Sequence, residues 1–478
     1  MNYGKIFRTL GILLQVEGAL MTLPVIVALI YSEKCWFSLF IVSLGAIILG
    51  TLLRWIKTKK ERIHAKEGFV ITALAWILLS IVGGLPFYFS GEIKSFVDAV
   101  FESASGFTTT GASILTDIEA MPHGLLFWRS FTHWIGGMGI LVFILVVIPS
   151  NADDMYLMKA ESPGPSVDKM LPKVRQTAMV LYGIYFGLTL LNIALLSIFG
   201  MPFFDALCIS FGDAGTGGFG VRNDSAASYN TACQIIITIF MFLFGVNFKL
   251  YFLIVFRKFK DILKSEEVLW YAIIYGVAVV LVTIGILKDV GNFGTALKEG
   301  AFQVSSIMTT TGYSTTDFNL WSSMPKAVLV LVMFIGACAG STGGGMKVSR
   351  CILWFKQIKI ELSKFIHPRS VNKVRLEKKA VDDMTLRTTN VYLMAYLLVF
   401  VISLLIVSID GFDLETTFTS VAATQNNIGP GLGMVGPAGG FSQFSVLSKI
   451  VLIFDMIAGR LELFPMLILL APSTWRRK

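Results

Sequence analysis

The sequence predicts an all-α integral membrane protein with about ten transmembrane helices. Two N-terminal helices are expected to precede four helix–pore loop–helix repeats, arranged with pseudo-four-fold symmetry around a central pore. Three observations support this fold class: an apolar composition, ten long apolar runs and a glycine-centred cluster that recurs four times. The 478 residues are 55% hydrophobic and only 15% charged, with a mean hydropathy of +0.72. Because a soluble chain is roughly 25% charged, this composition excludes an ordinary soluble protein.

The apolar runs are close to or above the ~20 residues that a helix needs to cross a bilayer. They occupy residues 9–31, 36–53, 69–90, 125–149, 176–200, 231–256, 268–287, 326–346, 388–409 and 446–471. The first run is too long for a signal peptide and has no small-residue cleavage site before Lys34, so it is expected to be a retained helix.

The positions of Lys and Arg predict the orientation, because positive loops stay on the cytoplasmic side. These residues gather in 54–66, 257–264, 347–379 and 476–478, which all fall on one side if there are ten crossings. Both termini are therefore predicted to be cytoplasmic. The net charge of +9 is interpreted as this topology signal, so the expected partner is the lipid bilayer and not nucleic acid.

The four glycine-centred clusters each follow a short segment that is too polar to span a membrane. The clusters are Thr109–Ser113, Thr216–Gly220, Thr310–Ser314 and Asn427–Gly431, and their central glycines are 107, 94 and 117 residues apart. This spacing predicts a degenerate repeat. The expected boundaries are an N-terminal extension at 1–66 and repeats at 67–170, 171–264, 265–380 and 381–478.

Each repeat carries further matching positions. An acid stands thirteen or fourteen residues before each central glycine: Asp98, Asp205, Glu299 and Glu415. We expect these acids at the N-termini of short re-entrant helices over 97–107, 203–213, 297–308 and 413–424, where they complement the helix dipole. Another glycine follows at 26 to 30 residues, within the next long helix: Gly137, Gly245, Gly340 and Gly459.

This pattern is typical of a cation pathway. A potassium ion in a membrane needs its hydration shell replaced by oxygens, and rings of backbone carbonyls do this. Glycine permits the backbone conformations that such loops require. The predicted K⁺ site is a selectivity filter formed by Thr109, Thr110, Gly111, Thr216, Gly217, Gly218, Thr310, Thr311, Gly312, Asn427, Ile428 and Gly429.

These clusters, together with residues 132–139 (THWIGGMG), 245–248 (GVNF) and 339–347 (AGSTGGGMK), resemble the bacterial TrkH/TrkG/KtrB potassium-transporter family. The resemblance runs from about residue 70 to the end, and the two additional N-terminal helices are similar to those of TrkH. It implies potassium uptake across the bacterial inner membrane by a homodimer, each protomer having its own pore. It also implies a cytoplasmic nucleotide-binding regulatory subunit of TrkA type, and no cofactor besides the transported K⁺. Relatives with serine in the first copy tend to favour sodium, so Gly111 favours potassium.

A gate is expected below the filter, in the segment 336–347 with Gly340, Gly343, Gly344 and Gly345. So many glycines make a poor helix, since each costs about 1 kcal/mol relative to Ala. The alternatives are a flexible helix end and, as the resemblance implies, a loop across the pore. Arg460 lies in the last apolar run, and a charge at this depth faces a cavity or a partner. An ion pair with Asp455 or Glu462 and a barrier facing the cavity both remain open.

Two other functions compete with channel-like conduction. One is an H⁺- or Na⁺-coupled potassium symporter, or a less selective K⁺/Na⁺ transporter, because the four filter positions carry different side chains. The other is a membrane enzyme, which would need acids, bases or metal ligands at one depth. No such constellation occurs in the sequence, so no enzyme is expected.

Overall fold

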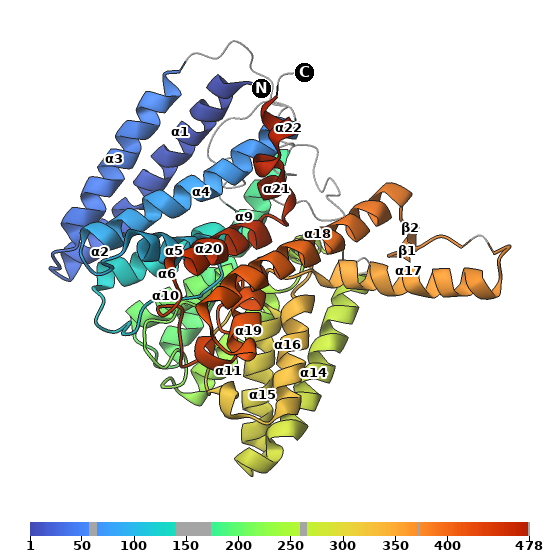
Figure 1. Ribbon diagram of the computed structural model, residues 1–478. Coiled ribbons are helices and arrows are strands. Elements are labelled where there is room, and N and C mark those ends of the chain that lie inside the picture. Colours follow the sequence, from blue (N-terminus) through green and yellow to red (C-terminus); the bar gives the residue numbers. More distant parts are fainter. Residues whose placement is uncertain (57–64, 140–173, 259–264, 371, 477–478) are drawn as a thin grey trace.

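The computed structural model describes residues 1–56, 65–139, 174–258, 265–370 and 372–476 (Figure 1). Almost all of these residues lie in helices or in the loops between them. Several predicted features lie outside the described residues: the end of the fourth apolar run at 140–149, the repeat boundaries at 170/171 and 264/265, and the basic residues within 57–64, 259–264 and 477–478.

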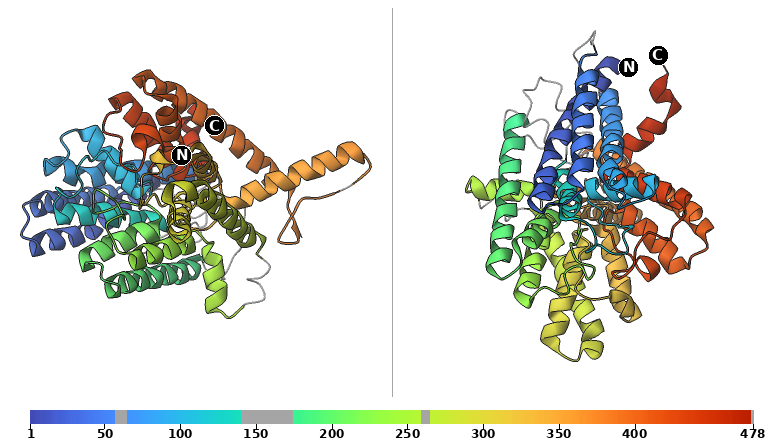
Figure 2. Two further views of the ribbon diagram at one scale, coloured as in Figure 1. Left: turned by 90° about the horizontal axis from the view of Figure 1, so that it is seen from below. Right: turned by 90° about the vertical axis from the view of Figure 1, so that its left-hand side faces the viewer.

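The N-terminal helices form a hairpin on one side of the molecule (Figures 1 and 2). Helix α1 (Tyr3–Leu20) continues past Met21 into α2 (Thr22–Ile30), and α3 (Trp36–Arg54) returns beside α1. A Cβ at Gly11 would lie 2.6 Å from the carbonyl oxygen of Gly50, so α1 and α3 are in backbone contact. Small residues permit such close packing of membrane helices, where lipid provides no hydrophobic driving force.

The rest of the chain repeats one arrangement four times: a long helix, a short helix and, after a loop, another helix. The four sets are α4 (Ala65–Phe89), α5 (Phe96–Phe107) and α6 (His123–Gly137); α9 (Val174–Ile198), α10 (Phe203–Gly215) and α11 (Thr231–Phe244) with α12 (Phe248–Val255); α14 (Glu266–Val290), α15 (Phe293–Met308) and α16 (Ser323–Ile335); and α18 (Asp383–Val407), α19 (Leu414–Gln425) and α20 (Val446–Arg460). The four short segments predicted from sequence are thus the helices α5, α10, α15 and α19.

The acids of these short helices follow the prediction at three positions. Asp98, Asp205 and Glu415 lie in the first turns of α5, α10 and α19. The prediction is wrong for Glu299, because α15 begins at Phe293, about a turn earlier than expected. Asn292 caps this helix, its side chain accepting from the backbone N–H of residues 294 and 295. The cap therefore occupies the place expected for the acid.

The long apolar runs form helices of different lengths, and one of them is sharply bent. Among the described residues, six helices are long and apolar enough to cross a membrane, and the α11–α12 pair, bent by 92°, makes a seventh candidate. The remaining runs contain α6, α16 and α20, which end after 15, 13 and 15 residues. The chain is accordingly an all-α multi-pass membrane protein in which the helices following the short helices are short or bent.

Three of the four glycines expected inside these following helices lie at their ends. Gly137 and Gly459 belong to the last turns of α6 and α20, and Gly245 caps α11 at the bend. The prediction is wrong for Gly340, since α16 ends at Ile335 and the chain leaves the helix there. Glycine thus marks where each helix stops or bends.

Smaller elements complete the structure. They are the 3-10 turns η1 (Phe318–Leu320), η2 (Ser408–Asp410) and η3 (Gly433–Val435), helices α17 (Val348–Ile366), α21 (Phe464–Leu470) and α22 (Pro472–Trp475), and the antiparallel strands β1 (Arg375–Leu376) and β2 (Lys379–Ala380). Helix α17 and the β1–β2 hairpin extend away from the bundle, and the start of α1 lies near α22 (Figures 1 and 2).

Candidate functional site

The four loops after the short helices share one backbone conformation. The residue two positions before each central glycine is left-handed, and the glycine itself also has a positive φ. The φ values are 55° at Thr109, 54° at Thr216, 61° at Thr310 and 56° at Asn427, then 80° at Gly111, 76° at Gly218, 91° at Gly312 and 94° at Gly429. A left-handed residue other than glycine costs roughly 1–2 kcal/mol. Strain of this kind collects at functional sites, so its fourfold recurrence marks these loops as one site.

The central glycines place the four loops around one axis. A Cβ on Gly111 would collide with the carbonyl oxygen of Gly217, and one on Gly218 with that of Thr311. A Cβ on Gly312 would collide with the carbonyl oxygen of Ile428. A Cβ on Gly429 would lie 2.8 Å from the carbonyl oxygen of Thr110, so the fourth loop contacts the first. The contacts run from repeat 1 to 2, 3, 4 and back to 1, and they require glycine for space as well as for φ.

Four carbonyl oxygens therefore hold equivalent places around this axis, one from each loop. Because the sign of φ alternates along the loop, successive peptide groups can present their oxygens to the same side. No group of three or more His, Cys, Asp or Glu side chains in the described part of the chain could hold a metal ion. The oxygens that these contacts bring against the central glycines are backbone carbonyls, a donor type that can replace water around a monovalent cation.

The middle residues of the four loops differ, and one side chain links the last loop to the first. Asn427 Nδ2 donates to Thr110 Oγ1 at 2.9 Å and to the carbonyl oxygen of Met456 at 2.8 Å. Asn427 is buried, and asparagine tolerates the left-handed conformation better than most residues do. The hydrogen bond to Thr110 links the fourth loop to the first. At that junction the carbonyl oxygen lies farther from the central glycine (2.8 Å from the Cβ position of Gly429) than at the other three.

Asn427→Ala is expected to lower the free energy of unfolding by about 2–3 kcal/mol, because two buried acceptors lose their donor and alanine is strained at this φ. Thermal unfolding in detergent measures the effect. Asn390→Ala is a matched control, since Asn390 makes a half-buried hydrogen bond of 3.2 Å to Gln357 far from the loops. Equal losses in both variants would contradict a special role of Asn427.

A buried ion pair behind the first loop was not predicted. Arg129 Nε lies 2.5 Å from Glu102 Oε1, with both side chains almost fully buried. Glu102 also accepts from Ser113 Oγ and the Ile114 N–H, while Arg129 donates to the carbonyl oxygen of Gly220. The pair thus connects the segments that leave the first and second loops. A charged residue in each of two membrane-embedded helices was the sequence signal for it.

His133 is a second residue that sequence analysis missed. Its Nδ1 lies 2.7 Å from the carbonyl oxygen of Gly106, and its Nε2 accepts from the Phe219 N–H at 3.2 Å. These two bonds fit a neutral ring that carries its proton on Nδ1. The fully buried ring joins the end of α5 to the loop after α10. It therefore positions two neighbouring loops, and a histidine inside an apolar run was the available signal.

The segment 336–347 lies directly against the loops. The Gly344 N–H donates to Thr310 Oγ1 at 2.6 Å, and the Gly345 N–H donates to the carbonyl oxygen of Asn426 at 3.1 Å. The carbonyl oxygen of Gly340 accepts from Phe248, and Gly343 lies against the carbonyl oxygen of Thr309. A flexible helix end would not make buried bonds to three repeats. The segment is a loop that covers one side of the ring, between α16 and α17.

Arg460 joins this covering loop to the ring. Its guanidinium donates to Thr109 Oγ1 at 3.2 Å, to the carbonyl oxygen of Thr342 at 2.7 Å, and to those of Gly136 and Gly137 at 2.5 and 2.6 Å. The two carboxylates considered from sequence have other partners. Asp455 accepts from Ser403, and Glu462 pairs with Arg350. Arg460 thus connects the segment 336–347 and the end of α6 to the first of the four loops.

Basic side chains accompany the acids of the short helices. Asp98 pairs with Lys449 at 2.6 Å, Asp205 with Arg222 at 3.2 Å, Glu299 with Lys298 at 2.9 Å and Glu415 with Lys326 at 3.6 Å. The Asp98–Lys449 pair joins repeats 1 and 4, and Glu415–Lys326 joins repeats 4 and 3. Asp98 and Glu415 therefore connect neighbouring repeats in addition to lying near helix N-termini, whereas the pairs of Asp205 and Glu299 lie within one repeat.

A multi-pass helical protein whose four loops bring carbonyl oxygens to one axis belongs to the class of membrane cation transporters. The family model named TrkH, described as "Cation transport protein", matches residues 37–477. The chain belongs to this family, which consists of transport proteins and not of enzymes.

Individual relatives cover the whole chain. It is 38% identical over 487 residues to the Trk system potassium uptake protein TrkH of Salmonella typhimurium, with both chains covered completely. It is 32% identical over 475 residues to the Trk system potassium uptake protein TrkG of Escherichia coli K12, covering 98% of this chain and 97% of the relative. The crystal structure of the potassium transporter TrkH from Vibrio parahaemolyticus matches with a TM-score of 0.89 and 33% identity over all of both chains.

Proposed function

We propose that this chain is the membrane subunit of a potassium uptake system and conducts K⁺ through the ring of loops. The observation that carries this proposal is the closed circle of contacts between each central glycine and the carbonyl oxygen of the next repeat. Relatives that align over the full chain are named potassium uptake proteins, which supports K⁺ as the transported ion.

The selectivity filter comprises the three residues of each loop that end at the central glycine. These are Thr109–Gly111, Thr216–Gly218, Thr310–Gly312 and Asn427–Gly429, contributed by repeats at 67–170, 171–264, 265–380 and 381–478. Their shared φ pattern supports the assignment. The carbonyl oxygens replace water around the ion, while the hydroxyl and amide side chains hold the loops in place.

The loop 336–347 and Arg460 form the gate. Gly343 and Gly344 let the loop pass close to the residues that precede the third and fourth filter segments, Gly340 and Gly345 let it pass Asn247 and Gly336, and Arg460 binds its Thr342 carbonyl. A fixed positive charge beneath the carbonyl ring raises the energy of a cation leaving the filter. Conduction therefore requires the loop and the guanidinium to move away from the axis.

The chain lies in a bacterial inner membrane with both termini in the cytoplasm. The proximity of the start of α1 to α22 and the positive loops support this orientation (Figure 1). It works as a homodimer with a cytoplasmic nucleotide-binding regulatory subunit of TrkA type. The name "Trk system" of the relatives indicates a system of several components, and the resemblance to the TrkH/TrkG/KtrB family supports these two partners.

Gly111→Ser is expected to abolish the preference for K⁺ over Na⁺, because any Cβ at Gly111 collides with the carbonyl oxygen of Gly217. The measurement is ⁸⁶Rb⁺ uptake into proteoliposomes with K⁺ or Na⁺ as competitor. Gly411→Ser is the control, since Gly411 has a similar φ of 77° but no atom within 4 Å of its Cβ position.

Two results would change the proposal, and a third would support the gate. Unaltered flux and preference in Gly111→Ser would show that the filter is elsewhere. Uptake that requires an imposed H⁺ or Na⁺ gradient would favour the coupled symporter. Absence of flux in the native protein together with flux in Arg460→Ala would support the gate and indicate that the regulatory partner is needed to open it.

A further inference from the structure

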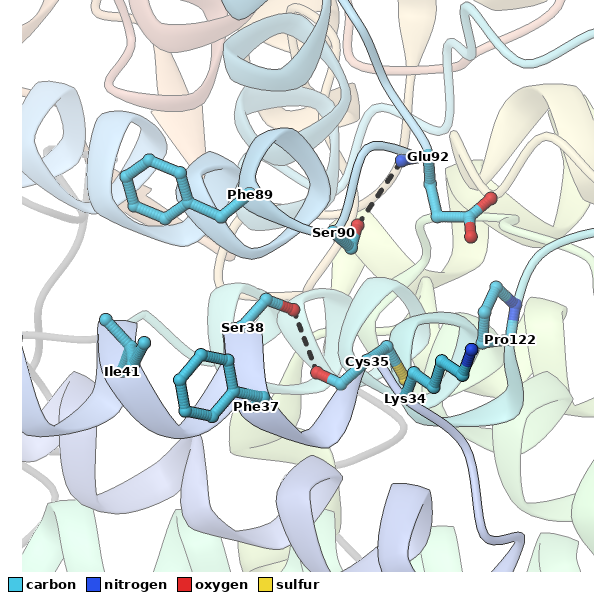
Figure 3. A pocket seen from close by; sticks show the side chains of 9 residues that line it. All are labelled: Lys34, Cys35, Phe37, Ser38, Ile41, Phe89, Ser90, Glu92 and Pro122. Carbon is cyan, nitrogen blue, oxygen red and sulfur yellow. Dashed lines mark hydrogen bonds between the residues drawn. The ribbon is translucent and has the colours of Figure 1, made fainter.

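A cavity lies outside the ion pathway, near the turn between α2 and α3. It has a volume of about 550 Å³ and opens between the start of α3 and the end of α4 (Figure 3). Its lining residues are Lys34, Cys35, Phe37, Ser38, Ile41, Phe89, Ser90, Glu92 and Pro122. The volume is within the range of about 300–1,000 Å³ of typical ligand sites. None of these residues takes part in the ring or the gate.

The lining is divided into an apolar and a charged part. Phe37, Ile41 and Phe89 lie together on one side in Figure 3, and Lys34 and Glu92 lie on the other. The serine hydroxyls are used within the protein, because Ser38 Oγ donates to the carbonyl oxygen of Cys35 at 2.8 Å and Ser90 Oγ donates to that of Phe87 at 3.0 Å. The charged groups left to recognise a ligand are therefore one ammonium and one carboxylate.

Lys34 and Glu92 do not pair with each other. Within the described ranges no ion pair includes either of them, although other acids and bases of the chain do pair. Both side chains are exposed at the mouth of the cavity. Two opposite charges that flank a cavity without meeting fit a ligand that carries both signs, its anion beside Lys34 and its cation beside Glu92.

The apolar part continues onto a surface that faces the membrane. Phe37 and Ile41 are 55% and 45% exposed, and Phe40, Leu44 and Ile48 extend the same exposed face along α3. Helix α3 is a candidate membrane span, so this face lies against lipid. The charged part lies at the end of that span, at the depth of the lipid headgroups. A ligand with a charged head and a long apolar tail fits both parts.

We propose that this cavity binds one phospholipid of the ethanolamine class from the surrounding bilayer. Lys34 donates to the phosphate oxygens, and the lipid's primary ammonium donates to Glu92. The acyl chains follow Phe89, Phe37 and Ile41 onto the outer face of α3. An anionic lipid lacks the cation that Glu92 requires, so the site selects the zwitterionic headgroup.

The test is native mass spectrometry of the purified full chain titrated with dioleoyl-phosphatidylethanolamine or with dioleoyl-phosphatidylglycerol. We expect one ethanolamine lipid to bind the native protein about tenfold more tightly than the Lys34→Ala/Glu92→Gln variant, an effect of the size of one charge-assisted contact. Phosphatidylglycerol is expected to bind both proteins about equally, because the variant loses the attraction of Lys34 for its phosphate together with the repulsion by Glu92. Lys94→Ala is the control, since Lys94 is an exposed lysine two residues after Glu92 that does not line the cavity.

Ile41→Trp tests the apolar part independently, because the larger side chain fills the space of the acyl chains. It is expected to remove the tight ethanolamine lipid while leaving the headgroup residues intact. Equal ethanolamine binding in the native and double-variant proteins would overturn the proposal, as would tighter binding of phosphatidylglycerol. A change of oligomeric mass without a change in lipid binding would instead assign the cavity to a contact with a second copy of this chain.

Discussion

Replacing Arg460 with alanine is expected to raise the initial rate of ⁸⁶Rb⁺ uptake by about 30- to 160-fold in the absence of any partner. The guanidinium holds a positive charge beneath the carbonyl ring and ties the loop at Thr342 to the filter at Thr109. At an effective dielectric constant of about 20, two unit charges roughly 5–8 Å apart repel by about 2–3 kcal/mol. Because 1.36 kcal/mol of barrier corresponds to tenfold in rate, removing this charge accounts for the expected increase.

Two control variants separate the effect of the positive charge of Arg460 from the effect of its hydrogen bonds to the loop. Arg460→Lys retains the positive charge but loses the planar fork that reaches four acceptors, so its uptake is expected to lie between those of the native and alanine proteins. Arg369→Ala removes an exposed arginine after α17 and is expected to leave uptake unchanged. If Arg460→Ala transports at the native rate while its thermal unfolding midpoint is also unchanged, the gate has been placed incorrectly.

The four loops of the proposed filter could be recognised in the sequence because their glycines are required for two reasons at once. Gly312, for example, has a φ of 91° and lies against the carbonyl oxygen of Ile428. No other residue satisfies both conditions, so each of the four loops has a glycine at the same position of the loop, two residues after the left-handed residue. The covering loop could be predicted for a related reason, since a run of glycines cannot continue α16.

Features that depend on partners distant in the chain were harder to predict. The start of α15 was missed because Asn292, and not Glu299, caps the helix. The contact of Arg460 with four backbone and side-chain oxygens requires knowledge of where α6 ends and where the loop lies. The lipid cavity is formed by two turns that periodicity alone does not bring together.

Removing one partner of the buried ion pair of Glu102 and Arg129 is expected to destabilise the protein more than removing one partner of an exposed pair. Arg129→Ala should lower the free energy of unfolding by about 3–5 kcal/mol, because it leaves a buried carboxylate without its counter-charge. It also removes the donor to Gly220 and the guanidinium that lies 3.5 Å from the Phe219 ring. The measurement is the thermal unfolding midpoint of the purified protein in detergent.

Lys364→Ala is the matched control, since Lys364 and Glu361 form an ion pair in which both side chains are about half exposed. Such a pair contributes about 0–1 kcal/mol, so this variant should unfold close to the native temperature. The double variant Glu102→Gln/Arg129→Met removes both charges and is expected to recover part of the loss. If it is no more stable than Arg129→Ala, the cost arises from lost packing behind the filter and not from the unpaired charge. If the double variant regains stability but lacks the native preference for K⁺ over Na⁺, the ion pair also holds the first two filter loops in register.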